Sequence, residues 1–409
     1  MPSGKERASG GCDTGSLRDR DLDPAWTGER MRISAVEPIL FDAGLGRIWC
    51  LVRVDTFEGV RGYGEATTTE PYSVATLIRR LGAWLVGEDA GRVQDLWQRM
   101  HGRYHNVRGG NVLLPAISGI EHALWDIKGK AAGLPVYEML GGAVRDRVPV
   151  YCNHMFFSVG GDPFFPQGDA ADAPARYRDR ALEAVSRGFG ALKLAPFGSI
   201  RDSIDASGIR HLEAVVGAVR DAVGPDVEIA IDTHGRFQMP AAIRVAQALE
   251  QFRPWFVEEL APPENLEVMR RLRERVRVPL ASGERAYGKW AFHTLLSSGA
   301  VEIVQVDVAH CGGILEARLI AGMAECHSVQ LAPHAWYGPV AMAASLQLDA
   351  TIPNLLVQEV PVPYLMPAAQ NELVGDPFPV TDRHVSIPSG PGLGLTIDED
   401  VLMYYRIDG

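Results

Sequence analysis

Acidic residues recur at a nearly constant interval in this chain of 409 residues, each at the end of a short apolar segment. Asp232, Glu258 and Glu284 are 26 residues apart, and Asp307 follows Glu284 after 23. One strand, one helix and their loops need about that many residues, so the four carboxylates occupy equivalent positions in successive strand–helix units. In a barrel, equivalent strand ends converge on the C-terminal mouth, where active sites lie.

Short apolar segments alternate with helical patterns from residue 148 to residue 360. This alternation favours parallel strands with crossover helices, and eight is the strand number of a TIM-type barrel. A doubly wound open sheet is the competing fold, but no glycine-rich dinucleotide fingerprint follows a strand. We predict an α/β fold with a TIM-type (β/α) barrel, whose strands are Val148–Asn153, Ala191–Leu194, Val227–Asp232, Trp255–Glu258, Pro279–Gly283, Ile303–Asp307, Val329–Pro333 and Leu355–Val360.

The residues before the barrel divide into two parts. Residues 1–30 are rich in Gly, Ser, Asp and Arg, and we expect a flexible N-terminal extension, with Met31 as a candidate start. Residues 31–145 begin with strand-like sequence around a glycine-containing turn and continue with three helical patterns, which indicates an α+β domain. The barrel then takes residues 146–365, and a C-terminal segment, 366–409, remains.

Composition excludes several classes of protein. The formal net charge of −11 lacks the basic excess that nucleic-acid binding needs. No apolar run approaches the roughly 20 residues of a membrane span, and the first residues lack the apolar stretch of a signal peptide. The five cysteines are odd in number and widely spaced, which suits a reduced compartment. We expect a cytoplasmic protein without nucleic-acid or membrane partners.

The repeated carboxylates predict a metal site. A single acid at a strand end is more often a helix cap or a solvated residue, but carboxylates gathered in a partly buried mouth repel one another, and a cation resolves that repulsion. Because the set offers oxygen ligands only, a hard ion such as magnesium is favoured over zinc.

Two histidines lie near these acids. His334 ends the strand after Asp307, and an Asp that accepts from one ring nitrogen would raise the basicity of the other, making His334 a general base. His234 lies two residues after Asp232, so strand alternation predicts that it faces the same mouth. A structural role, as a carbonyl-bonded or loop-capping histidine, is the alternative for both.

Further charged residues end other strands. Lys193 ends the second strand and is either an acid–base group or a fixed charge facing an anionic substrate, with a simple ion pair as the alternative. Glu359 ends the last strand and could hydrogen-bond a substrate carboxylate if protonated. Glu259 and Arg285 adjoin the acids but should point away by strand alternation, so we interpret them as structural.

Several segments together carry a family resemblance. They are Ile231–Arg236, Phe256–Glu259, Gly283–Arg285, Gln305–Asp307 with Gly312–Gly313, Ala332–His334, Ser118–Asp126 and Pro388–Gly394. Together they resemble the mandelate racemase/muconate lactonizing enzyme branch of the enolase superfamily, and within it the sugar-acid dehydratases of the D-galactonate dehydratase type. The resemblance covers nearly everything after Met31.

The resemblance implies a modified, enolase-like barrel whose capping domain combines the N-terminal segment with the C-terminal tail. It also implies one magnesium ion per subunit, held by Asp232, Glu258 and Glu284. Asp307 and His334 would form a dyad, Glu359 would assist at the eighth strand, and the protein would be a homo-oligomer. Cap loops near residues 41–47 and 65–71 would choose the substrate, together with Asn153, His154, Trp336 and Tyr337.

Two departures from the family pattern bear on the reaction. The racemases carry Lys-x-Lys on the second strand, whereas Lys193 is followed here by Leu194 and Ala195. Loss of the second lysine argues against two-way racemisation. The usual Glu-Glu-Pro is also changed, to Glu258-Glu259-Leu260, which leaves the ligand itself intact.

These observations predict a magnesium-dependent lyase that dehydrates an aldonate or aldarate to a 2-keto-3-deoxy acid through an enediolate. In this reaction His334 removes the α-proton, Lys193 and magnesium hold the carboxylate charge, and His234 protonates the departing β-hydroxyl. The first alternative is an epimerase, racemase or cycloisomerase on the same scaffold that uses Lys193 and His334 as opposed bases. The second is a binding protein that kept the fold without the chemistry.

Overall fold

The computed structural model describes residues 31–44, 46–106, 108–153, 172–198, 200–361, 368–376 and 378–407, all within one compact unit that spans Met31–Gly409. The expected N-terminal extension, residues 1–30, and the candidate specificity residue His154 lie outside the described residues. No helix in the described part of the chain is long and apolar enough to span a membrane.

The N-terminal part is a three-stranded antiparallel sheet packed on helices, in the order β1-β2-β3. The third strand packs on the last long helix at very short range: a Cβ added at Gly64 would overlap the carbonyl of Gly119, so both glycines are needed for this packing. The strands are β1 (Ile33–Gly44), β2 (Arg47–Thr56) and β3 (Arg61–Glu65), and the helices are α1 (Pro71–Leu85), α2 (Val93–Arg103), α3 (Gly110–Ala132) and α4 (Val136–Met139).

The second part contains all eight predicted barrel strands, which confirms the predicted fold class. They form one parallel sheet in the order β10-β9-β8-β7-β6-β5-β4-β11. Several are shorter than predicted, although hydrogen bonds continue past their ends, as from Ala332 N to Val304 O (2.9 Å) and from His334 N to Val306 O (3.1 Å). The strands are β4 (Arg147–Asn153), β5 (Ala191–Leu194), β6 (Glu228–Asp232), β7 (Val257–Glu258), β8 (Leu280–Ser282), β9 (Ile303–Val304), β10 (Gln330–Leu331) and β11 (Gln358–Pro361).

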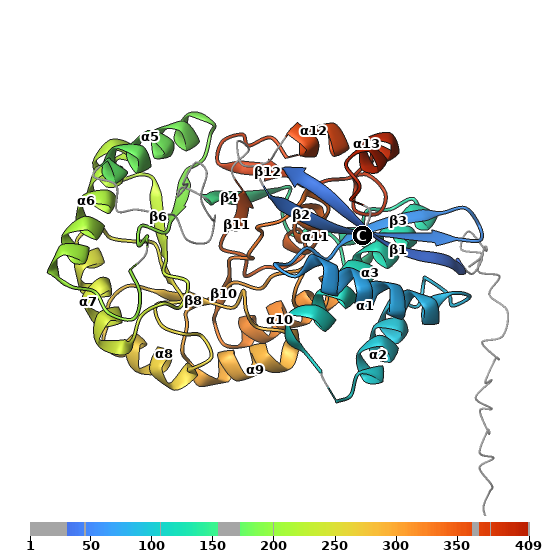
Figure 1. The fold of residues 1–409 in the computed structure, drawn as a ribbon, viewed down its shortest axis with the longest axis horizontal. Helices are drawn as coiled ribbons and strands as arrows, with labels where there is room; N and C mark the ends of the chain where they lie inside the picture. The colour runs from blue at the N-terminus through green and yellow to red at the C-terminus, as the bar shows by residue number, and fades with distance from the viewer. Residues whose placement is uncertain are drawn as a thin grey trace, which may run out of the picture. The chain divides into compact units, whose positions relative to one another are not determined.

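Backbone hydrogen bonds join the two ends of this sheet. Leu331 N donates to Asn354 O over 2.9 Å, and Leu356 N donates to Leu331 O over 2.7 Å, which ties β10 to the segment leading into β11. Helices alternate with the strands, and Figure 1 shows α5 to α9 following one another around the outside of the strands. The helices are α5 (Ala173–Ser186), α6 (Ala206–Val223), α7 (Met239–Glu250), α8 (Leu266–Arg273), α9 (Gly288–Ser298), α10 (Ile314–Cys326) and α11 (Pro339–Asp349).

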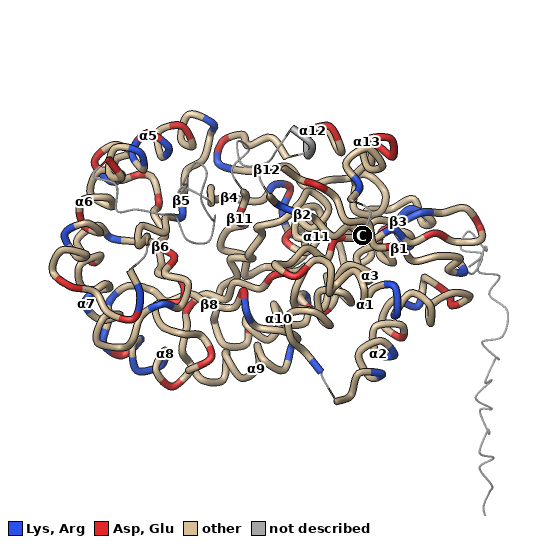
Figure 2. Tube along the Cα trace, viewed as in Figure 1, with Lys and Arg blue, Asp and Glu red and all other residues tan. Residues whose placement is uncertain are grey.

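Acidic and basic residues are interspersed along these outer helices (Figure 2). Many of the pairs they form are exposed, as for Arg270 and Glu267 on α8, whose side chains are 39% and 64% exposed. Such pairs contribute only about 0–1 kcal/mol each, so stability must come from the buried contacts between strands and helices.

The C-terminal residues return to both parts. They contain α12 (Ala368–Val374), β12 (His384–Ser386) and α13 (Glu399–Tyr404), and β12 pairs antiparallel with β4. Further on, Asp42 N donates to Tyr405 O and Ile407 N donates to Leu40 O, which places the last described residues beside β1. The predicted domain boundaries themselves stay predictions.

Buried carboxylates from the N-terminal part cap two barrel helices. Glu121 on α3 accepts hydrogen bonds from Ile314 N (2.9 Å) and Leu315 N (3.0 Å) at the start of α10, and from Trp125 Nε1 (2.8 Å). Burial, which outweighs these hydrogen bonds, raises the pKa of Glu121 to about 7. Glu65 at the end of β3 likewise accepts hydrogen bonds from backbone N–H groups at the start of α11. These contacts fasten the N-terminal part to the barrel.

Replacing Glu121 with Ala should therefore lower stability, because three buried donors lose their acceptor. We expect a decrease in the free energy of unfolding of about 1–3 kcal/mol. Glu267→Ala, which removes an exposed acid from the first turn of α8, is the matched control and should change it by roughly 0.5 kcal/mol or less. Urea unfolding followed by circular dichroism measures both; equal effects would contradict the assigned role of Glu121.

Candidate active site

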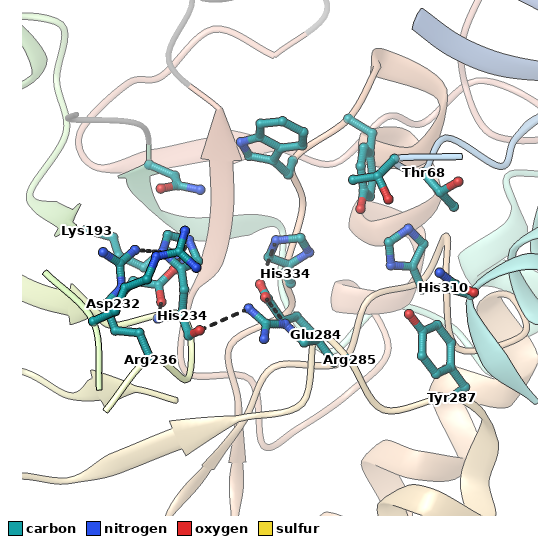
Figure 3. A pocket seen from close by; sticks show the side chains of 16 residues that line it. Thr68, Lys193, Asp232, His234, Arg236, Glu284, Arg285, Tyr287, His310 and His334 are labelled. Atoms are coloured by element: carbon teal, nitrogen blue, oxygen red, sulfur yellow. Dashed lines mark hydrogen bonds and ion pairs between the residues drawn. The ribbon is translucent and has the colours of Figure 1, made fainter. Parts of the chain in front are cut away.

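A cavity of about 490 Å³ lies at the C-terminal ends of the barrel strands. Side chains from both parts of the chain line it: Thr68, Thr69 and Asn111 from the N-terminal part, and the rest from the barrel (Figure 3). The barrel residues are Asn153, Lys193, Arg201, Asp232, His234, Arg236, Glu284, Arg285, Tyr287, His310, His334, Trp336 and Tyr337. The cavity thus includes five of the eight predicted site residues.

Lys193 lies at the centre of a buried charge cluster. Its Nζ is 2.7 Å from Glu258 Oε2, 3.3 Å from Glu359 Oε1 and 3.7 Å from Asp232 Oδ2. Gln305 Nε2 also donates to Glu258 Oε2 over 2.6 Å. Burial disfavours the charged ammonium, but Glu258 and Glu359 outweigh it and raise the pKa of Lys193 well above its usual value.

His234 lies beside Asp232, although not for the predicted reason. Strand β6 ends at Asp232, and His234 follows in a turn with φ of 52°, so strand alternation does not apply. The ring nevertheless returns to the site, with Nε2 at 3.1 Å from Asp232 Oδ2. Arg236 approaches Nδ1 at 3.3 Å and can only donate, so the Nε2 atom carries the hydrogen.

The expected contact between His334 and Asp307 is present. His334 Nδ1 lies 2.7 Å from Asp307 Oδ2, and Asp307 Oδ1 accepts from Ala309 N over 2.8 Å. A carboxylate can only accept, so Nδ1 carries a hydrogen and Nε2 is the atom that turns toward the cavity. Nε2 lies 3.1 Å from Glu284 Oε2.

The acids and imidazoles shift one another's pKa. Burial and neighbouring charge raise the pKa of Asp232 to about 6 and that of Glu258 to about 8. For Glu284, burial is outweighed by His334 and Arg285, and its pKa falls to about 2. These directions follow from carboxylates crowded around a few positive groups.

The two histidines shift in opposite directions. Burial lowers the pKa of His234 to about 4. Burial also acts against the charged form of His334, but Glu359, Glu284 and Asp307 outweigh it and raise its pKa to about 10. Without a metal ion, the extra proton therefore resides on His334, and His234 is neutral. A bound divalent cation would be the largest local charge and would change this balance.

Glu359 is fully buried and does not line the cavity. Its Oε1 accepts from Asn153 Nδ2, and its Oε2 accepts from Ala335 N over 3.0 Å. Both oxygens thus have protein donors, and contact with a substrate carboxylate stays a prediction. Asp307 and Glu258 also lie behind the cavity wall.

The expectation that Arg285 points away from the site is wrong. Arg285 lines the cavity and forms ion pairs with Glu259 (3.1 Å) and Glu284 (3.3 Å). The reason is that β8 ends at Ser282, so the following residues no longer alternate between the two faces. Glu259 is buried beneath it, as the partner of this arginine.

Gln305 and His310 are among the site residues that were missed in the sequence. Gln305 lies two residues before Asp307, and the period of a strand could have placed it on the same face. His310 follows Asp307 by three residues in a loop, where no period applies. Its Nδ1 lies 3.5 Å from Asp307 Oδ2.

The three predicted metal ligands do not converge on one point. Among the described residues, no three His, Cys, Asp or Glu side chains form a group that could hold a metal ion as they stand. Asp232, Glu258 and Glu284 each turn an oxygen toward a neighbouring nitrogen instead. Glu258 Oε1, however, is buried without a hydrogen-bond partner. An unsatisfied buried carboxylate oxygen fits a site completed by a cation.

Comparison with known proteins agrees with this geometry. Residues 176–401 match the family described as enolase C-terminal domain-like, and residues 46–141 match the mandelate racemase/muconate lactonizing enzyme N-terminal domain. The chain belongs to the enolase superfamily. These matches confirm the predicted resemblance to the mandelate racemase/muconate lactonizing enzyme branch of the enolase superfamily. They also confirm the prediction that the protein is an enzyme.

Named members of this superfamily are similar over most of the chain. The D-gluconate dehydratase of Thermoproteus tenax is 35% identical over 94% of this chain and 76% of its own length. The D-galactonate dehydratase of Variovorax paradoxus (strain S110) is 38% identical over 87% of this chain and 90% of its own. The 3,6-anhydro-D-galactonate cycloisomerase of Zobellia galactanivorans superposes with a TM-score of 0.81 at 29% identity, covering 92% of this chain and all of that one.

Removal of the Lys193 ammonium should destabilise the metal-free protein, because the buried carboxylates around it lose the positive charge that compensates them. For Lys193→Met we expect a loss of about 3–5 kcal/mol in the free energy of unfolding. Arg270→Met, which breaks exposed ion pairs on α8, should cost about 0.5 kcal/mol or less. Denaturant unfolding in EDTA measures both, and similar losses would contradict the charge cluster described above.

Proposed function

We propose that this enzyme dehydrates a sugar acid, an aldonate or aldarate, to a 2-keto-3-deoxy acid, with magnesium held by Asp232, Glu258 and Glu284. The main support is the arrangement of His234 and His334, which face one cavity and contact different carboxylates. Dehydration needs a base for the α-proton and an acid for the β-hydroxyl. The names of the dehydratase relatives agree with this substrate class.

The base half of the reaction belongs to His334. Asp307 holds its Nδ1–H, so Nε2 is the atom that would take the α-proton. Nε2 contacts Glu284 in the metal-free protein, and the base becomes available only when that carboxylate is engaged elsewhere. A metal ligand role for Glu284 meets that requirement.

Magnesium fits this set of residues. Its ligands are oxygen atoms, as a hard cation prefers, and the orphaned Glu258 Oε1 offers one of them. When bound, the ion supplies a Lewis acid for the negative charge that develops on the substrate carboxylate, as in enolase-superfamily sites generally. Lys193 would add a fixed positive charge beside it.

The acid half belongs to His234. Arg236 donates to its Nδ1, so Nε2 is the atom that carries the hydrogen. This atom contacts Asp232 in the metal-free protein, and it would be available to the substrate if Asp232 held a cation. His234 would then donate the Nε2 hydrogen to the departing β-hydroxyl.

The rival reaction, epimerisation or cycloisomerisation with Lys193 as a second base, is less well supported. Three carboxylates surround the Lys193 ammonium, which is only 1% exposed and has a raised pKa. A base needs a neutral amine, which this environment opposes. The cycloisomerase among the solved relatives keeps this reaction as the second candidate.

The remaining cavity residues suit a polyhydroxylated substrate. Thr68, Thr69, Asn111 and Asn153 offer further hydrogen-bonding groups along the cavity. A cytoplasmic location and a homo-oligomer stay predictions.

A screen of aldonic and aldaric acids with the full chain and magnesium tests the proposal. We expect one or a few acids to give 2-keto-3-deoxy products, detected as semicarbazones, and EDTA to abolish turnover. His334→Asn should lower kcat by about 10²–10⁴-fold, because the base is removed. His293→Asn, at an exposed position on α9, is the matched control and should retain activity. Isomerised acids without keto product would exclude dehydration in favour of the rival.

A second variant separates the two proton transfers. His234→Asn should lower keto-acid formation by about 10²-fold or more, yet still exchange the α-proton of the substrate in D₂O, because His334 is intact. Proton NMR of recovered substrate measures the exchange. Undiminished dehydration in His234→Asn would refute the assigned acid.

A further inference from the structure

His310 lies between the N-terminal part and the pair formed by Asp307 and His334. It belongs to the loop between β9 and α10, lines the cavity, and is only 8% exposed. Its ring packs against Tyr337 at 4.8 Å and Tyr287 at 6.4 Å between ring centroids. Figure 3 shows His310 beside Tyr287, across from His334.

Both ring nitrogens of His310 face oxygen acceptors. Nε2 lies 3.0 Å from the carbonyl oxygen of Thr67, and Nδ1 lies 3.5 Å from Asp307 Oδ2. The Nε2 atom donates to the Thr67 carbonyl when it carries the hydrogen, and the Nδ1 atom faces the carboxylate of Asp307.

The Thr67 carbonyl that holds this ring is itself fixed. Thr67 Oγ1 donates to Glu65 Oε1 over 2.7 Å and accepts from Cys50 N over 3.0 Å. Glu65 in turn accepts from Gly338 N (2.7 Å) and Ala341 N (2.9 Å) at the start of α11. A buried network of hydrogen bonds therefore runs from the N-terminal sheet to the ring of His310.

Two helices of the N-terminal part, α2 and α3, also form hydrogen bonds with this loop. His122 Nε2 contacts Val308 O at 3.2 Å, and Trp97 Nε1 donates to Gly312 O over 2.7 Å. The loop that begins at Asp307 is thus bounded by the N-terminal part on several sides. The orientation of its carboxylate depends on these contacts as well as on the barrel.

We propose that His310 is a positioning residue for proton abstraction: it holds the carboxylate of Asp307 in place for His334, and the Thr67 carbonyl holds His310. Asp307 Oδ2 then lies between two imidazoles, with His334 at 2.7 Å and His310 at 3.5 Å. Because both nitrogens of His310 have protein partners, the ring has no polar atom left for the substrate. Its effect is on the proton-transfer step and not on substrate affinity.

Three variants of the full chain, assayed with magnesium, test this role. The side-chain nitrogen of Asn takes the position of Nδ1 in histidine, and that of Gln takes the position of Nε2. His310→Asn therefore keeps a donor toward Asp307, whereas His310→Gln keeps only the donor toward Thr67. His310→Phe keeps the packing between the two tyrosines and removes both donors.

The inference rests on the proposed function, since the measured reaction is the dehydration of the sugar acid found in the screen. We expect His310→Gln and His310→Phe to lower kcat by about 10- to 100-fold with little change in KM, and His310→Asn to retain more activity than either. Unchanged kcat in Gln and Phe, a raised KM at unchanged kcat, or Asn below Gln would each overturn the proposal. Equal losses in all three with lowered melting temperatures would show a structural role only.

Failure of the proposed function would give a different result. A wild-type protein that exchanges the α-proton in D₂O without forming keto acid would refute dehydration. We would then expect the rates of α-proton exchange to follow the same order among the His310 variants as given above for kcat. If neither reaction occurs, ¹⁵N-histidine NMR of the metal-free chain decides, with His310 assigned by its loss in His310→Gln. We expect the ring ¹⁵N resonances of His310 to shift on Asp307→Asn, because the carboxylate faces its Nδ1 atom. No response to Asp307→Asn would overturn the proposal.

Discussion

The burial of several carboxylates at one end of a parallel sheet is the constraint on which the rest of the site depends. Each must meet a positive or hydrogen-donating group, because an uncompensated charge in the interior costs several kcal/mol. Asp232 meets His234, Glu258 meets Lys193, and Glu284 meets His334, at 3.1, 2.7 and 3.1 Å. Every predicted metal ligand is thus paired with a predicted catalytic group.

The same principle joins the two parts of the chain. Glu65 and Glu121 are buried carboxylates of the N-terminal part, and both are satisfied by backbone N–H groups at the start of barrel helices. Since a helix N-terminus favours negative charge, Glu65 and Glu121 serve as fixed links across the boundary. Asp126 on α3 accepts instead from Leu393 N in the C-terminal segment and from Tyr63 N on β3. Cavity-lining residues from both parts can then keep a common geometry.

Much of this arrangement could be predicted from the sequence, because it follows from periods. The eight strands and the four acids repeat with the strand–helix unit. The contact between Asp307 and His334 follows from it, because the two residues end neighbouring units. Arg285 and His310 lie beyond the ends of their strands, where no period governs the chain, and only the folded loops place them in the cavity. His234 was correctly placed by an argument that does not hold, since its φ of 52° takes it out of the strand. For Lys193 the sequence left an ion pair and a role in the site as alternatives, and the structure shows that it forms ion pairs with three carboxylates and also lines the cavity.

The pairing of ligands with catalytic groups has a consequence for the proposed reaction. The atoms that contact the carboxylates are Nε2 of His234, Nε2 of His334 and Nζ of Lys193, and these are the atoms to which the proposed reaction assigns a role. A cation that engages the three carboxylates would free all three nitrogens together, because each carboxylate would exchange its protein partner for the metal. Asp232, Glu258 and Glu284 would hold the proposed magnesium ion, which would supply a Lewis acid for the substrate carboxylate. The same coordination would leave His234 and His334 available as acid and base. In the metal-free protein, by the same reasoning, the catalytic groups stabilise the fold by neutralising the buried acids.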